Sequence, residues 1–128
     1  MSKFMLLSIN PQYSKLIYDG YKRFEYRTRL PTRRDLPILI YESRPVKCVT
    51  GIVAGAHYLK DDPQELWEHT KFGAGISANE FKDYFRGCDT ASAIELFSVY
   101  RFPRPLNLGE RGLPKVPPRS FCYVDVDL

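Results

Sequence analysis

Two long stretches of strand-like sequence, residues 47–59 and 91–102, restrict most strongly what this chain can fold into. Gly51 and Gly55 interrupt the first stretch and predict a bend or a bulge there. Two short helical segments separate the two stretches, so the chain does not follow a repeating strand–helix–strand pattern. This order of elements predicts a small mixed β-barrel.

Shorter elements surround this pair of strands. An apolar run over residues 4–9 predicts a buried strand, and Asn10 with Pro11 predicts the start of an early helix. The capping box of Ser77 and Glu80 predicts the start of the second helix in the inserted pair. Further strands are expected over residues 22–29, 36–41 and 121–126.

The expected fold class is therefore α+β and mainly β, a barrel of five or six strands with an early helix and an inserted helical pair. A length of 128 residues predicts one domain, residues 1–128. No apolar run approaches the ~18 residues of a membrane-spanning helix, so no membrane is expected as a partner. Because the N-terminus lacks an export signal and the three cysteines are odd in number, we expect reduced thiols and a cytoplasmic protein.

Charge is unevenly distributed along the chain, whose formal net charge is +4. Residues 20–50 contain eight basic residues against three acidic ones, and residues 61–95 contain eight acidic residues against three basic ones. Such asymmetry can mark a basic face that binds a phosphate-rich partner, but charge alone favours two solvated faces of opposite sign, because most charge runs are solvated faces.

The sequence predicts neither a metal site nor a cofactor. His57 and His69 are the only histidines, and neither lies near a cysteine at the spacing of metal ligands. The chain also lacks the glycine-rich signatures that hold nucleotide phosphates.

The most informative stretch for chemistry is residues 20–27, which read GYKRFEYR. Strand alternation places Glu25 and Arg27 on one face, with Lys22 at the entrance of the strand. A carboxylate between two cations can hold a polar ligand, because the cations bind phosphate or carbonyl oxygens and the carboxylate accepts from an amine. An ordinary ion-pair set on a barrel strand explains the same residues.

These residues also form the pattern GxKxxExR, by which the chain resembles the ASCH superfamily of PUA-like domains. The resemblance extends to Ser8-Ile9-Asn10-Pro11, to YxSxPVK over residues 41–47, and to PPxSFxY over residues 117–123. The last of these segments is similar to the closing strand of small bacterial and phage-borne members, which suggests a phage or prophage origin.

The resemblance implies a PUA-like barrel with a cleft beside the first helix and a ligand that is RNA or a nucleotide. One branch of the superfamily hydrolyses N4-acetylcytidine with a Lys, a Thr and a late Glu. Lys22 and Glu95 match the first and last of these, but Glu25 stands at the Thr position and cannot repeat acyl transfer by a hydroxyl.

We therefore expect an RNA- or nucleotide-binding protein. The expected ligand-binding residues are Lys22, Glu25, Arg27, Tyr41, Ser43 and Lys47. A hydrolase of a modified nucleoside or of RNA is the first alternative, with Lys22, Glu25 and Glu95 as its catalytic residues. A regulatory interaction module without catalysis is the second.

Overall fold

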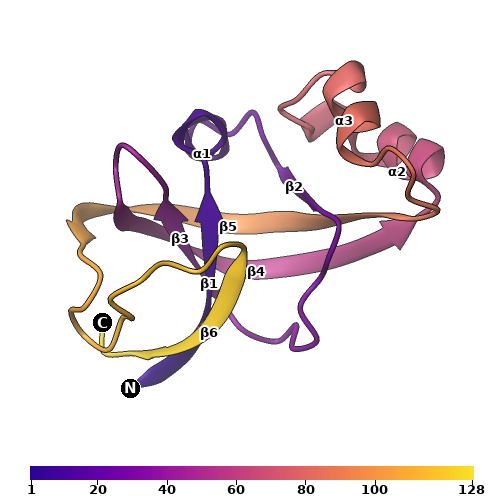
Figure 1. Ribbon diagram of the computed structural model, residues 1–128. Helices are drawn as coiled ribbons and strands as arrows, with labels where there is room; N and C mark the ends of the chain where they lie inside the picture. Colours follow the sequence, from indigo (N-terminus) through magenta and orange to yellow (C-terminus); the bar gives the residue numbers. More distant parts are fainter.

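The computed structural model describes residues 1–128 and contains six strands, three α-helices and one turn of 3-10 helix (Figure 1). In chain order these are β1 (Ser2–Ile9), α1 (Pro11–Tyr18), β2 (Phe24–Arg27), β3 (Ile38–Glu42), β4 (Cys48–Asp61), α2 (Pro63–Thr70), η1 (Lys71–Gly73), α3 (Ala78–Tyr84), β5 (Ala91–Leu106) and β6 (Phe121–Val126). The predicted fold class is confirmed: the chain is mainly β, with an early helix and a helical pair before a late strand.

The strands form one sheet in the order β2-β5-β4-β3-β1-β6. β1 and β3 are parallel, and every other neighbouring pair is antiparallel. The backbone ladder does not close into a full barrel, because β2 and β6 are the two outer strands. We call the unpaired side between these two strands the seam of the sheet. The Arg27 side chain on β2 spans it, because Arg27 donates to the Ser8 carbonyl oxygen on β1 at 2.6 Å and to Ser120 Oγ before β6 at 3.0 Å.

The two long strands, β4 and β5, pair with each other along most of their length and form the longest strand pair of the sheet. Their register shifts between Val49 and Gly51, where the sequence predicts a bulge. A side chain at Gly51 would collide with the Tyr18 hydroxyl and with the Tyr100 carbonyl oxygen, so the glycine lets α1 pack closely on the sheet. Both strands extend a few residues beyond the predicted limits.

The core has three parts. One lies between the sheet and α1 and includes Ile17, Ile40 and Ile94. A second lies around β1, β3 and β6, and a third packs α2 and α3 against β2 and β5 through residues such as Phe81. Figure 1 shows α2 and α3 at one end of the β4–β5 pair and α1 at a separate place above the sheet, with β2 between them.

The helix starts follow the predicted caps. Asn10 Oδ1 accepts from the backbone N–H of Gln12 at the start of α1. Ser77 and Glu80 form both hydrogen bonds of a capping box at the start of α3. None of the helices is long and apolar enough to cross a membrane.

Candidate functional site

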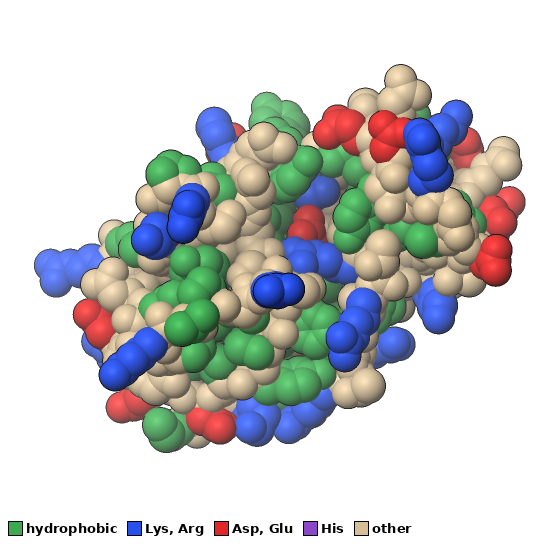
Figure 2. All heavy atoms as spheres, in the orientation of Figure 1, with side chains coloured by type: hydrophobic (Ala, Val, Ile, Leu, Met, Phe, Trp, Pro, Cys, Tyr) green, Lys and Arg blue, Asp and Glu red, His purple; other side chains and the backbone are tan.

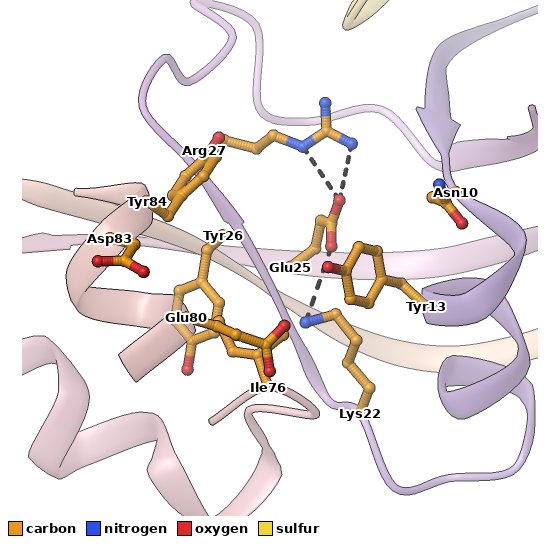
Figure 3. Close-up of a pocket in the computed structure, with 10 residues that line it drawn as sticks. All are labelled: Asn10, Tyr13, Lys22, Glu25, Tyr26, Arg27, Ile76, Glu80, Asp83 and Tyr84. Carbon is orange, nitrogen blue, oxygen red and sulfur yellow. Dashed lines mark hydrogen bonds and ion pairs between the residues drawn. The ribbon is translucent and has the colours of Figure 1, made fainter. Parts of the chain in front are cut away.

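A cleft of about 610 Å³ opens between α1 and α3, with β2 at its floor. We call it the helix-side cleft. Its lining residues are Asn10, Tyr13, Lys22, Glu25, Tyr26, Arg27, Ile76, Glu80, Asp83 and Tyr84. Figure 2 shows a hollow at this place with basic and acidic side chains at its base, and Figure 3 shows that the residues come from both helices and from β2. The GxKxxExR motif therefore lies in a cleft, and not on an open strand face.

Lys22 is buried at the base of the helix-side cleft, with 3% of its surface exposed. Its Nζ donates to the Ala74 carbonyl oxygen at 2.7 Å and lies 3.9 Å from Glu25 Oε1. The same ammonium lies over the rings of Tyr13 and Tyr26, at 5.5 and 5.1 Å from their centroids. Burial lowers the pKa of Lys22, and the negative charge of Glu25 opposes this shift. The ammonium is thus held by one strong hydrogen bond and two aromatic rings.

Glu25 and Arg27 point the same way from β2, as the alternation predicts. Arg27 Nε and Nη2 both donate to Glu25 Oε2, at 3.1 and 2.7 Å. Glu25 Oε1 accepts from neither of these nitrogens and faces Lys22 across the cleft (Figure 3). Because Arg27 also bonds Ser8 and Ser120, its guanidinium ties the carboxylate on β2 to β1 and to the end of the loop before β6.

A second cleft, of about 890 Å³, lies beside the first. We call it the basic cleft. Its lining residues are Ser8, Asn10, Tyr41, Ser43, Arg44, Lys47, Asn107, Leu108, Lys115, Val116, Pro117, Pro118 and Arg119. Four of them are cations and none is a carboxylate, so the cleft attracts anions. Tyr41, Ser43 and Lys47 lie here, apart from Lys22, Glu25 and Arg27.

The two clefts meet at the seam of the sheet. Asn10 lines both of them. Ser8 Oγ donates to the Pro118 carbonyl oxygen at 2.7 Å, and the Ser8 carbonyl oxygen accepts from Arg27. Arg27 thus joins the wall of the basic cleft to the floor of the helix-side cleft. The six predicted ligand-binding residues form two neighbouring groups of three, on either side of this junction.

Glu95, the remaining predicted catalytic residue, lies outside both clefts. In the β2–β5 ladder Glu25 is paired with Ile94 and Phe24 with Glu95, so Glu25 and Glu95 point to opposite faces of the sheet. The Glu95 carboxylate instead lies 3.5 Å from Nδ1 of the exposed His57. The structure therefore does not bring Glu95 together with Lys22.

Several lining residues were not identified from the sequence. Tyr13 lies on the face of α1 that meets Lys22, and Asp83 and Tyr84 come from the last turn of α3. Only the packing of the inserted helices beside β2 brings α3 to the motif. Arg44 and Arg119 reach the basic cleft from two loops that are far apart in the sequence.

The two clefts differ in what they can bind. The helix-side cleft offers aromatic rings, a carboxylate oxygen that Arg27 does not bond and one buried ammonium, which suit a planar polar group. The basic cleft offers cations and neutral polar groups beside a few apolar side chains, and no carboxylate, which suits an anion such as phosphate. No group of three or more His, Cys, Asp or Glu side chains is placed to hold a metal ion.

Comparison with known proteins shows to which family the chain belongs. No family model matches the chain. A curated relative from Zymomonas mobilis subsp. mobilis, the ASCH domain-containing ribonuclease, is 34% identical over 127 residues, which cover 93% of this chain and 82% of the relative. The chain belongs to the ASCH superfamily. This confirms the family that the GxKxxExR motif predicts.

Solved structures agree with this assignment. The crystal structure of ASCH from Zymomonas mobilis has a TM-score of 0.82 at 29% identity and covers 94% of this ASCH chain and 87% of its own. A serine-to-alanine variant of the same protein has a TM-score of 0.84 at 30% identity. Large ribosomal subunit protein uL22 of Ureaplasma parvum is 25% identical over 122 residues, which cover 94% of this chain but 39% of that protein.

Proposed function

We propose that this ASCH chain binds single-stranded RNA across the helix-side cleft and the basic cleft, and cleaves the strand there. The observation that carries the proposal is the junction at Arg27, where a cleft suited to a base meets a cleft suited to phosphate. A nucleotide within a strand presents these two chemistries side by side. The ribonuclease described for the relative that is 34% identical supports RNA as the substrate class.

The basic cleft takes the phosphates in this proposal. Arg44 and Lys47 follow the end of β3, and Lys115 and Arg119 face them from the loop before β6. Cations of this kind neutralise phosphate and release counterions, which supplies most of the affinity of a basic protein for RNA. Tyr41 and Ser43 add hydroxyl groups at the same place.

The helix-side cleft takes a base. Tyr13 and Tyr84 offer rings on which a base can stack. Glu80 and Asp83 stand at the α3 side and repel phosphate. This charge difference orients the strand, because the phosphates are drawn to one cleft and kept out of the other.

Cleavage needs stabilisation of the negative charge that develops on the phosphoryl oxygens in the transition state. We assign this role to Lys47, which lies in the basic cleft. The strand is cut when a 2′-hydroxyl attacks the adjacent phosphorus and the P–O5′ bond breaks, which leaves a 2′,3′-cyclic phosphate and a 5′-hydroxyl. We assign Glu25, whose Oε1 faces the cleft, to take the proton of the attacking 2′-hydroxyl, and Lys22 to substrate positioning; a water molecule protonates the departing 5′-oxygen. Glu95 has no role in this proposal, since it lies outside both clefts.

The test is cleavage of a 5′-labelled single-stranded RNA, followed on a denaturing gel. We expect the wild-type protein to cut the strand. Lys47→Ala should lower the rate by on the order of a hundredfold, as the loss of a group that stabilises transition-state charge does. Glu25→Gln should retain RNA binding and lose cleavage.

Lys82→Ala is the matched control, because Lys82 is an exposed cation on α3 that lines neither of the two clefts. Its cleavage rate should equal that of the wild type. Binding without any cleavage would replace the nuclease with an interaction module. Turnover of N4-acetylcytidine without RNA cleavage would replace it with a nucleoside hydrolase.

A further inference from the structure

A group of arginines and aromatic rings outside both clefts has no part in the proposed cleavage. It consists of Arg29, Arg34, Tyr58, Phe121 and Tyr123, and we call it the arginine–aromatic surface. The guanidinium of Arg29 lies 6.0 Å from the centroid of the Phe121 ring, and that of Arg34 lies 5.6 Å from the centroid of the Tyr58 ring.

These residues form one continuous surface although they come from three segments of the chain. The Phe121 and Tyr123 rings are 6.3 Å apart, centroid to centroid. The Tyr123 hydroxyl accepts from the backbone N–H of Arg33 at 3.1 Å, which ties β6 to the loop that carries Arg34. Arg34, the residue after Arg33, lies over the Tyr58 ring and so links β4 to the same surface. Figure 1 shows the loop between β2 and β3 passing below the sheet on the side of β6.

The two arginines of this surface are free of acidic partners, although Arg34 Nε donates to the Pro31 carbonyl oxygen at 3.1 Å. Neither Arg29 nor Arg34 has a carboxylate within ion-pair distance. The two carboxylates in the region already have partners, because Asp35 pairs with Arg33 and Asp125 with Lys3. Both free arginines are exposed. An exposed guanidinium on an aromatic ring, without an acidic partner, is a typical contact for the bases and phosphates of a single strand.

The surface continues directly from the junction of the two clefts. Arg27 Nη1 donates to Ser120 Oγ at the junction, and the next residue after Ser120 is Phe121. Arg29 likewise follows Arg27 by two residues. A strand that leaves the junction on this side therefore meets Arg29 and Phe121 first.

We propose that the arginine–aromatic surface binds the part of a single-stranded RNA that extends beyond the two clefts. This inference rests on the proposed function, since it assigns a path to the same substrate. Phosphates lie against Arg29 and Arg34, and a base stacks on the partly exposed rings. The consequence is that affinity rises with RNA length beyond the nucleotides that the clefts hold.

The test compares two fluorescently labelled single-stranded RNAs, of about 4 and about 16 nucleotides, a range that brackets the usual site size of a single-strand-binding domain. Fluorescence anisotropy, recorded before measurable cleavage, gives both affinities. We expect the wild-type protein to bind the longer RNA more tightly. The double variant Arg29→Ala/Arg34→Ala should lose about tenfold or more in affinity for the longer RNA and nothing for the shorter one.

Two further variants sharpen the test. Lys71→Ala/Lys82→Ala removes the same charge from the surface of η1 and α3 and should bind both RNAs as the wild type does. Arg29→Lys/Arg34→Lys keeps the charge but removes the planar group, and should recover only part of the lost affinity. The inference is overturned if the double alanine variant binds the longer RNA within about twofold of wild type, or if length has no effect. If the wild type binds neither RNA, the proposed function itself fails.

Discussion

Lys22 is a charged residue of the proposed site whose side chain the structure also buries. The sequence predicts a lysine at the entrance of a strand, and the structure buries it under Tyr13 and Tyr26 with its ammonium on the Ala74 carbonyl oxygen. Its side chain also fills the space beside Gly75, where an added Cβ would collide with the lysine stem. Replacing Lys22 by Ala therefore costs packing as well as charge, so Lys22→Met is the cleaner probe because it keeps the apolar stem.

The lowered pKa of Lys22 predicts a pH dependence of stability. Between the folded pKa and the ordinary value of 10.5, the unfolded chain holds the proton that the folded chain has lost. Stability from this group therefore rises with pH through that window, and is lost as the pH falls through the folded pKa. The free energy of unfolding of wild type minus that of Lys22→Met should increase from neutral pH towards pH 10.5, measured by denaturant unfolding. An unchanged difference would show that Lys22 titrates as a solvated lysine does.

At the scale of elements, α3 is short, and its start depends on the Ser77–Glu80 capping box. Ser77→Ala should lower the free energy of unfolding by about 1 kcal/mol, because one backbone N–H at the helix start loses its acceptor. Asn79→Ala, at the second residue of the same helix, is the control and should not destabilise the protein, since alanine is the better helix former. Urea unfolding of the wild type and the two variants measures both effects. A loss of stability in Ser77→Ala alone shows that the cap is lost, whereas an equal loss in both variants would show a general effect of alanine at this end of α3.

The elements also show what the sequence could predict. Caps and alternation are local, so the helix starts at Asn10 and Ser77 and the common face of Glu25 and Arg27 were predicted correctly. The face of Glu95 depends on its register against β2, which joins residues far apart in the chain. No local sequence pattern predicts that register. The ion pair of Glu95 with His57 could therefore be found only in the structure.

At the scale of the whole molecule, one predicted binding site became two adjoining clefts. The sequence predicted six ligand-binding residues in one site, but it could not divide them between two clefts, because the division depends on where the loop before β6 crosses β3 and β1. That loop brings Lys115 and Arg119 opposite Lys47. The cations of a chain with a modest net charge are thereby gathered in one cleft that has no acidic residue in its lining. The uneven charge noted along the sequence thus corresponds to a basic cleft beside a mixed one.

The central claim, that the basic cleft neutralises RNA phosphates, is tested most directly by the salt dependence of single-stranded RNA affinity. The logarithm of the association constant should fall linearly with the logarithm of the salt concentration, by about 0.7 for each phosphate neutralised. Lys47→Ala/Lys115→Ala should flatten that slope by about 1.4, and Lys82→Ala should leave it unchanged. An affinity that barely changes with salt, or a slope that the double variant leaves as steep as in the wild type, would contradict the claim.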